Sequence, residues 1–244
     1  MRRHAKGKHL VVLLDFDGTL CEFEADPAAV QLPESRRQAI LRIQKRATVA
    51  IVSGRRMEDV RDRCALDGGA IVAGLHGLEI EGLDERYVHP DLEKASAAVA
   101  DVSEALRTVA AGIPGAFVED KGASVALHFR EADADGQRAA LDAFASAAAP
   151  HVESGRLRVM RGSYVLELLP NIEWNKGNAV QWILERIERQ KGPVFAVYIG
   201  DDVTDQDAFA AVEGRGLAIA ASDRVTANIH LDGPVGVERF LHAL

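Results

Sequence analysis

Two carboxylates that follow an apolar segment are the first candidate catalytic residues in the sequence. Asp15 and Asp17 stand in the string Asp-Phe-Asp-Gly-Thr-Leu of residues 15–20, where Gly18 permits a sharp turn. One ionised carboxylate can attack phosphorus while the second gives a proton to the leaving oxygen. An Asp-Gly pair also suits an ordinary turn after a strand. Taken alone, the string supports either interpretation.

Three further segments carry groups suited to an anion or a cation. The Ser-Gly-Arg of residues 53–55 offers a hydroxyl and backbone N–H groups where a helix could start, which suits phosphate or a simple helix cap. Lys176 can neutralise a phosphate and an attacking carboxylate together, or it can be a solvated surface residue. Adjacent Asp201 and Asp202 would repel each other, so either a cation such as Mg²⁺ or an acidic loop explains them.

The elements around these residues predict an α/β fold. Short apolar runs, typical of strands buried on both faces, occupy residues 10–14, 47–52, 70–73, 194–199 and 217–220. Helical patterns at residues 33–46, 55–64 and 179–187 alternate with them, which predicts a doubly wound parallel sheet of the Rossmann-like type. Ligands of such sheets bind beyond the carboxyl ends of the strands. Asp15, Ser53 and Asp201 each follow a predicted strand there.

The middle of the chain has a different order. A helix with Val99, Val102, Leu106 and Val109 on one face leads into two short strands at residues 116–119 and 124–129. A second helix at 135–148 leads into two more strands at 156–160 and 164–168. This order predicts a small antiparallel sheet with helices on one face. We therefore expect an inserted α/β cap domain at residues 89–169, which splits a catalytic core of residues 1–88 and 170–244.

The order of the four motifs resembles the haloacid dehalogenase superfamily of phosphatases. The resemblance covers the whole predicted core. It implies that Asp15 is the nucleophile that forms a phospho-aspartate and that Asp17 is the general acid and then the general base. It implies that Ser53 and Lys176 hold the phosphoryl group, with Gly54 and Arg55 beside the substrate. It also implies Mg²⁺ bound by Asp15, Asp201 and the carbonyl of Asp17, with support from Asp202.

Other strings resemble the trehalose-6-phosphate phosphatase family. They are Gly-Leu-His-Gly-Leu-Glu at 74–79, Glu-x-Lys at 119–121 with a following His-x-Arg at 128–130, and the acidic string at 200–209. Alternation along the strand would place His128 and Arg130 on one face. Leu169 departs from the family pattern, which usually has Arg or Lys there. The resemblance assigns sugar contacts to His76, Gly77, Glu119, Lys121, His128, Arg130 and Glu167.

Composition excludes several other classes of protein. The 244 residues carry a net charge of −8, and because Arg2, Arg3, Lys6 and Lys8 are the only charges in residues 1–9, the remainder carries −12. An acidic body disfavours a nucleic-acid partner. Two cysteines cannot build a disulfide framework, and no apolar run approaches the roughly 20 residues that cross a bilayer. We expect a cytoplasmic protein without a membrane partner, and a monomer by default.

The function predicted from the sequence is hydrolysis of trehalose 6-phosphate to trehalose and phosphate, with Mg²⁺ as cofactor and a small-molecule sugar phosphate as partner. A phosphatase for sucrose phosphate or glucosylglycerol phosphate is the alternative within enzymes. A receiver domain also combines an Asp, a hydroxyl group and a Lys at strand ends, but it needs neither Asp17 nor the insert. A binding protein without catalysis would not need the intact set Asp15, Asp17, Lys176 and Asp201.

Overall fold

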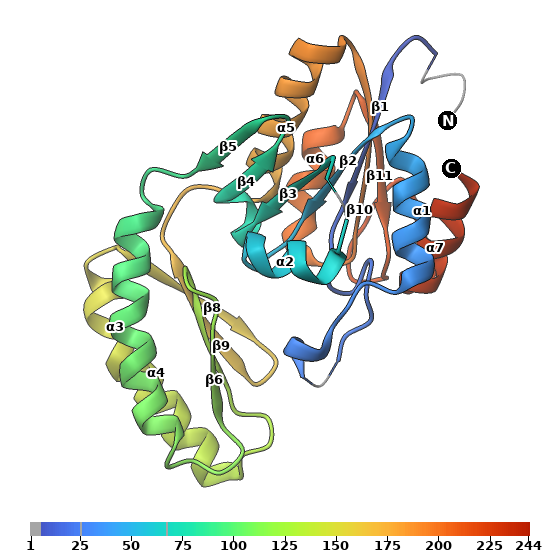
Figure 1. The fold of residues 1–244 in the computed structure, drawn as a ribbon. Helices are drawn as coiled ribbons and strands as arrows, with labels where there is room; N and C mark the ends of the chain where they lie inside the picture. Colours follow the sequence, from blue (N-terminus) through green and yellow to red (C-terminus); the bar gives the residue numbers. More distant parts are fainter. Residues whose placement is uncertain (1–5, 25, 67) are drawn as a thin grey trace. The chain divides into compact units, whose positions relative to one another are not determined.

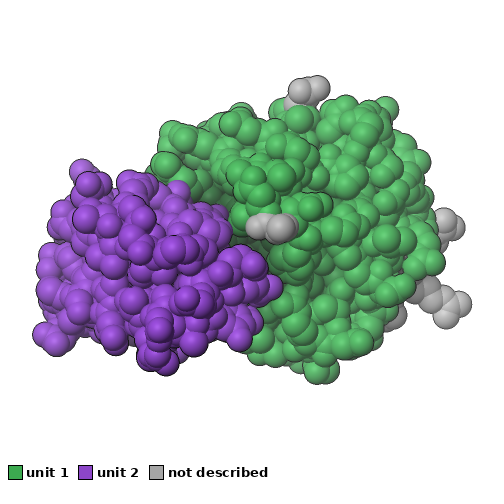
Figure 2. Space-filling model, turned by 90° about the horizontal axis from the view of Figure 1, so that it is seen from below, with its two compact units in different colours: residues 1–88, 174–244 green, residues 89–173 purple. Residues whose placement is uncertain are grey.

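The computed structural model describes residues 6–24, 26–66 and 68–244, and the chain divides into two compact units (Figure 1). Unit 1 comprises residues 1–88 and 174–244, and unit 2 comprises residues 89–173, coloured green and purple in Figure 2. Arg2 and Arg3 of the predicted basic tail lie outside the described residues. None of the helices in the described ranges is long and apolar enough to cross a membrane.

The second boundary between the units differs from the predicted one. It lies between Glu173 and Trp174, whereas the sequence placed it between residues 169 and 170. The difference has a structural cause, because Pro170 still pairs with Leu157 in the sheet of unit 2. The N–H of Asn171 then donates to the carbonyl of Arg156, which keeps that residue with the same sheet.

Unit 1 is built on an eight-stranded sheet in the order β12-β11-β10-β1-β2-β3-β4-β5. The first six strands in this order are parallel, five of them predicted and β12 not, and β4 and β5 are antiparallel. The terminal hairpin was not predicted from the sequence. The strands are β1 (His9–Leu14), β2 (Thr48–Val52), β3 (Ala70–Gly74), β4 (Glu79–Gly82), β5 (Glu85–Val88), β10 (Val194–Gly200), β11 (Gly216–Ala220) and β12 (Ile229–His230).

Helices cover both faces of this sheet. Side chains of β1 alternate between two cores: Val12 and Leu14 pack with α1 (Glu34–Gln44), α2 (Met57–Cys64) and α7 (Gly233–Ala243), and Val11 and Leu13 pack with α5 (Lys176–Lys191) and α6 (Gln206–Val212). Each such fully buried side chain stabilises the fold by about 1.5–3 kcal/mol. Burial on both faces explains the continuous apolar run in the sequence. Short 3₁₀ helices occupy Pro27–Ala29 (η1), Leu75–Gly77 (η2) and Val203–Asp205 (η3).

Unit 2 follows the predicted order of helix, hairpin, helix and hairpin. Its sheet is antiparallel in the order β6-β7-β9-β8, and its core contains residues from both helices and from β7, β8 and β9. Val99, Val102 and Leu106 are buried as predicted, but Val109 is 42% exposed and Ala110 takes the inward position. The elements are α3 (Leu92–Ala110), β6 (Phe117–Asp120), β7 (Val125–His128), α4 (Ala134–Glu153), β8 (Leu157–Gly162) and β9 (Val165–Pro170).

The two cysteines are expected to be unreactive in the folded protein. Cys21 and Cys64 are buried and free, and the Cys21 thiol donates a hydrogen bond to the carbonyl of Gln31. Burial raises the pKa of Cys21 to about 12 and also raises the pKa of Cys64, so neither forms a thiolate at pH 8. An aromatic disulfide reagent should therefore label no thiol in the native protein and both after denaturation. Rapid labelling of either thiol in the native protein would contradict this.

Candidate active site

Three predicted site residues of unit 1 lie at one edge of its sheet because three neighbouring strands end there. β1 leads into Asp15, β2 into Ser53 and β10 into Asp201, and β1 lies between the other two in the sheet. Parallel strands bring their carboxyl ends to the same edge. Lys176 begins α5, which packs on this sheet. The structure therefore places Asp15, Ser53 and Asp201 at one edge of the sheet, with Lys176 in contact with Asp15.

Lys176 is the cation at the centre of this cluster. Its ammonium Nζ lies 2.7 Å from Oδ1 of Asp15 and 2.7 Å from Oδ1 of Asp205, and its side chain is only 3% exposed. Although burial alone would lower the pKa of Lys176, the carboxylates of Asp15 and Asp205 raise it above its ordinary value. The side chain is thus held as a buried ammonium.

Asp205 holds Lys176 in place and was not among the predicted site residues. Its Oδ1 accepts hydrogen bonds from Lys176 and from the hydroxyl of Tyr198, at 2.7 Å each. Its Oδ2 accepts from the backbone N–H groups of Asp201 and Asp202. A carboxylate has about four acceptor sites, and all four are used here. The signal in the sequence was the third acid of Gly-Asp-Asp-Val-Thr-Asp.

Asp201 and Asp202 separate although they are adjacent. Asp201 is buried, accepts a hydrogen bond from Thr19 at 3.2 Å and pairs with Arg224. The side chain of Asp202 is 48% exposed, and its nearest cation is Arg224 at 3.7 Å. The structure therefore brings Asp201 toward Asp15 and leaves Asp202 at the surface.

The donor set fits a divalent cation. Ligand oxygens of Asp15, Asp201 and Asp205 lie within 4.8 Å of one another, and all three residues are buried. Burial raises the pKa of Asp15 well above its ordinary value, and the charges of Asp205 and Asp201 add to this effect. Because the hydrogen bonds of Asp205 are saturated, Asp15 and Asp201 are the better ligands of this group. Carboxylate oxygens are what Mg²⁺ prefers.

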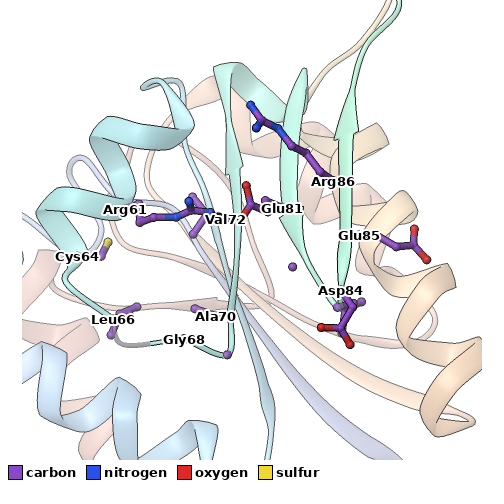
Figure 3. Close-up of a pocket in the computed structure, with 13 residues that line it drawn as sticks. Arg61, Cys64, Leu66, Gly68, Ala70, Val72, Glu81, Asp84, Glu85 and Arg86 are labelled. Carbon is purple, nitrogen blue, oxygen red and sulfur yellow. Dashed lines mark ion pairs between the residues drawn. The ribbon is translucent and has the colours of Figure 1, made fainter.

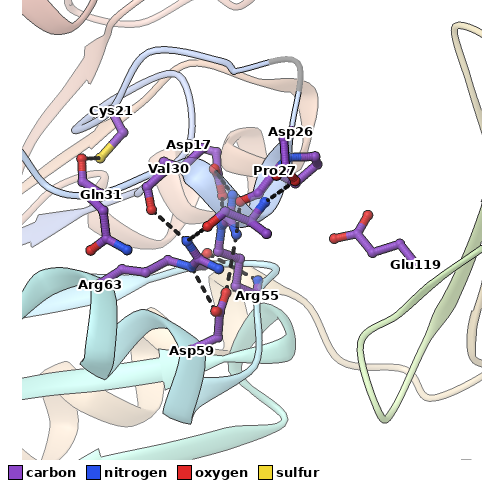
Figure 4. Close-up of polar contacts among 12 residues, drawn as sticks. Asp17, Cys21, Asp26, Pro27, Val30, Gln31, Arg55, Asp59, Arg63 and Glu119 are labelled. Carbon is purple, nitrogen blue, oxygen red and sulfur yellow. Dashed lines mark hydrogen bonds and ion pairs between the residues drawn. The ribbon is translucent and has the colours of Figure 1, made fainter.

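Asp17 lies in an ion pair rather than in the carboxylate cluster. The Nε and Nη2 atoms of Arg55 donate to its two oxygens at 2.7 and 2.6 Å (Figure 4). Such a two-point pair fixes both the position and the orientation of the carboxylate. The sequence placed Arg55 beside the substrate, and the structure shows that this guanidinium is already engaged by Asp17.

The loops after β2 and β3 meet next to this pair. Ser53 is buried, and its hydroxyl accepts a hydrogen bond from the N–H of Arg55 at 3.1 Å. The N–H of His76 donates to the carbonyl of Ser53. A side chain at Gly54 would lie 2.8 Å from the His76 ring, so only glycine leaves room for that ring. Gly77 has φ of 95° and packs against Ala179. The two loops thus bring together the predicted residues Ser53, Gly54, Arg55, His76 and Gly77.

The polar residues predicted in unit 2 form a second cluster, with one exception. Glu167 accepts hydrogen bonds from Lys121 at 3.1 Å and from Ser124 at 2.7 Å, and His128 lies 3.0 Å from Glu119. Ser124 was not among the predicted site residues. Arg130 lies beyond the end of β7, is exposed, and donates to the carbonyl of Ser163. The structure therefore does not place Arg130 on the strand face that carries His128.

A large hollow in unit 1 contains none of the predicted site residues. It has a volume of about 790 Å³ and lies beside the β4–β5 hairpin and the beginning of β3 (Figure 3). Arg61 and Glu81 in its wall pair with each other at 2.7 Å. The carboxylate cluster instead lies beyond the carboxyl ends of the strands.

Relatives with curated names share nearly the whole chain. It is 36% identical to a trehalose-phosphate phosphatase of Mycolicibacterium paratuberculosis over 98% of this chain and 62% of that protein. It is 37% identical to a trehalose-phosphate phosphatase of Mycobacterium marinum over 94% of this chain and 60% of that protein. The chain thus spans less than two thirds of the length of these relatives.

Solved structures show the same fold. A trehalose-6-phosphate phosphatase related protein matches with a TM-score of 0.78 and 22% identity, and covers 95% of each chain. A haloacid dehalogenase-like hydrolase from Bacteroides thetaiotaomicron matches with a TM-score of 0.66 and 18% identity, over 97% of this chain and 99% of that chain. The family model for trehalose-phosphatase matches residues 13–229. That match runs from the end of β1 to the start of β12 and contains all the site residues described above, and the chain belongs to the trehalose-phosphatase family.

Proposed function

We propose that this protein is a Mg²⁺-dependent phosphatase that converts trehalose 6-phosphate to trehalose and phosphate through a phospho-aspartate on Asp15. The observation that carries the proposal is the buried contact of Lys176 with both Asp15 and Asp205, next to Asp201. Membership of the trehalose-phosphatase family supports the choice of substrate. The two buried free cysteines agree with the proposed cytoplasmic location.

In the first step, an oxygen of Asp15 forms a bond to phosphorus and the bond from phosphorus to the sugar oxygen breaks. Asp17 gives a proton to the departing sugar oxygen. The ammonium of Lys176 and the hydroxyl of Ser53 hold the negatively charged phosphoryl oxygens, and phosphoryl transfer depends mainly on such positioning and charge neutralisation. The position of Lys176, 2.7 Å from Asp15, supports this role.

In the second step, Asp17 accepts a proton from water, the water oxygen bonds to phosphorus, and the bond to Asp15 breaks to release phosphate. Asp15, Asp201 and the carbonyl of Asp17 would hold Mg²⁺, which neutralises charge on the phosphoryl group. Asp202 would contribute only indirectly, because its side chain is half exposed and faces Arg224. Asp205 would position Lys176, since its own oxygens are saturated.

A substrate panel tests the proposed function. Phosphate release should be measured from trehalose 6-phosphate, sucrose phosphate and glucosylglycerol phosphate under one set of conditions. We expect kcat/KM for trehalose 6-phosphate to exceed the others by at least about tenfold, because a site that hydrogen-bonds hydroxyl groups discriminates strongly against sugars that place them differently. Preference for another sugar phosphate would overturn the assignment of substrate, while no release from any would overturn the assignment as a phosphatase.

Removal of divalent cations should abolish turnover. The carboxylates of Asp15 and Asp201 lie buried near Asp205, and a cation in this group offsets their repulsion. After treatment with a chelator, added Mg²⁺ should restore activity and should also raise the melting temperature of the protein, by an amount that grows with the logarithm of the Mg²⁺ concentration above Kd. Full activity in excess chelator, or a melting temperature that does not respond to Mg²⁺, would contradict the proposed site.

We further propose that the cluster of unit 2 binds the hydroxyl groups of the sugar. Its members are a Lys, a His and two Glu that already hydrogen-bond one another, which is the chemistry that a sugar ring needs. Arg130 remains a predicted contact. Lys121→Met should lower kcat/KM for trehalose 6-phosphate by at least about tenfold and that for 4-nitrophenyl phosphate by less than about threefold. Lys94→Met, on an 84% exposed side chain, is the control, and equal losses on both substrates would argue against sugar binding.

A further inference from the structure

We infer that Asp59 and Arg63 on α2 are positioning residues for Asp17: they align the Arg55 guanidinium, which holds the Asp17 carboxylate in place to accept the proton of water. The inference rests on the proposed function, because it concerns the second step of that reaction. Neither residue was singled out by its sequence. Their contacts, burial and charges assign the role.

Arg55 is held on all sides within unit 1. Its Nε and Nη2 atoms bond to Asp17, and its Nη1 atom donates to Asp59 at 3.2 Å and to the carbonyl of Pro27 at 3.0 Å. Its guanidinium carbon lies 5.7 Å from the centre of the Phe16 ring. Four of its five N–H donors are therefore in use. Its side chain is 12% exposed, so solvent screens these contacts only weakly.

Asp59 joins Arg55 to a second arginine. Its Oδ2 accepts from Arg55 and its Oδ1 accepts from Nε of Arg63 at 2.7 Å, so one carboxylate separates two guanidinium groups (Figure 4). Arg63 is four residues further along α2 and only 11% exposed. Its Nη1 atom donates to the carbonyls of Ala28 and Val30 at 2.8 and 2.6 Å. The two arginines thereby hold the segment around η1 against α2.

The charge balance gives Asp59 a defined task. With Asp59 present, each arginine of the network has a carboxylate partner. Without that charge, Arg55 and Arg63 would repel each other across the same space, and Nη1 of Arg55 would keep only the carbonyl of Pro27. Arg55 would then shift, and Asp17 would shift with it, because both of its oxygens are bound by this one side chain. A displacement of about 1 Å at a reacting group can cost about 100-fold in rate.

The test separates the two chemical steps. In rapid mixing with 4-nitrophenyl phosphate and Mg²⁺, the first phase reports formation of phospho-Asp15, because this leaving group needs little protonation, and the steady state includes its hydrolysis by water. Asp59→Asn should change the rate of the first phase by less than about threefold and should lower the steady-state rate by at least about tenfold. Loss of folded protein would lower the amplitude of the first phase and the steady-state rate together, so a selective effect also requires a first-phase amplitude within about threefold of wild type.

Asp62→Asn is the matched control, since Asp62 is an exposed acid on the same helix. Arg63→Lys is a second variant that keeps the charge but cannot reach Asp59 and two carbonyls at once, and it should show the same selective loss if Asp59→Asn folds poorly. Equal losses in both phases, or a steady-state rate within about threefold of wild type in both variants, would overturn the inference. If the wild-type protein releases no nitrophenolate, the proposed function fails first.

Discussion

Replacement of Asp15 by Asn is expected to lower kcat for trehalose 6-phosphate by at least about 1,000-fold while the protein stays folded. The amide has the same shape as the carboxylate but is not a nucleophile toward phosphorus. Lys176 keeps its second carboxylate partner, Asp205, at 2.7 Å, so it is not left as an unpaired buried charge. The activity loss should therefore be chemical in origin.

The effect of Asp15→Asn on stability has a predicted sign. Burial raises the pKa of Asp15 above the ordinary value of 3.8, so the folded protein binds a proton here more tightly than the unfolded chain. Ionisation then lowers the free energy of unfolding as the pH rises above about 4. A neutral Asn at this position does not lower the free energy of unfolding in this way. In the presence of a chelator, the melting temperature of the Asp15→Asn protein at pH 7 should equal or exceed that of the wild type.

Steady-state kinetics and thermal unfolding of the same preparation check the predicted loss of activity and the predicted change in stability. Asp101→Asn, on an exposed position of α3, is the control and should change neither quantity. Activity of Asp15→Asn within tenfold of wild type would remove Asp15 from the role of nucleophile. A melting temperature well below that of wild type would show that the carboxylate stabilises the fold.

Lys176→Met is expected to lower the free energy of unfolding by about 3–5 kcal/mol, the usual consequence of removing one partner from a buried ion pair. Lys176 is bonded to two carboxylates, and the loss leaves Asp15 and Asp205 buried near Asp201 without their ammonium. Methionine fills a similar volume, so cavity formation contributes little. Turnover should also be lost, because in the proposed mechanism Lys176 both contacts the nucleophile Asp15 and holds the phosphoryl oxygens.

Denaturant unfolding in the presence of a chelator measures this effect. Lys191→Met is the matched control, because Lys191 is an exposed residue at the other end of α5. The control should change the free energy of unfolding by less than about 0.5 kcal/mol. A loss of less than about 1 kcal/mol for Lys176→Met would show that the buried pair stabilises the protein much less than its geometry indicates.

The core strands could be predicted because each is buried on both faces. Val11 to Leu14 pack alternately into two cores, which requires an unbroken apolar run. The hairpin of β4 and β5 carried no such signal. Its turn places Leu83 and Asp84 at φ of 56° and 59°, a conformation that hairpins usually give to Asn-Gly. The Leu-Asp turn lacks the Asn-Gly pair that marks such a hairpin in a sequence.

The candidate site could be predicted where a motif follows a strand. It could be predicted less well where tertiary contacts determine the hydrogen-bond partners of a side chain. Asp15, Ser53 and Asp201 lie at one edge of the sheet as the strand order requires, and Lys176, at the start of α5, contacts Asp15. The saturation of Asp205 depends on Tyr198 and on two backbone amides, which no spacing reveals. The pairing of Arg55 with Asp17 is likewise a tertiary contact.

Unit 2 shows the same limit in the strand that carries His128. The alternation that was expected to align Arg130 with His128 holds only inside a strand, and β7 ends at His128. In the next turn of chain, the N–H of Phe129 donates to the carbonyl of Tyr164 and Arg130 lies exposed. Sequence periodicity could not show where pairing with the neighbouring strand stops.

Trapping of the phosphoenzyme tests the central claim most directly. The protein should be mixed with trehalose 6-phosphate and Mg²⁺ and then treated with borohydride, which reduces an aspartyl phosphate to homoserine, and the modified residue should be located by mass spectrometry. We predict homoserine at position 15, absent without Mg²⁺ or substrate and absent from Asp15→Asn. Release of phosphate with Asp15 unmodified, or homoserine at position 17 or elsewhere, would contradict a phospho-aspartate on Asp15.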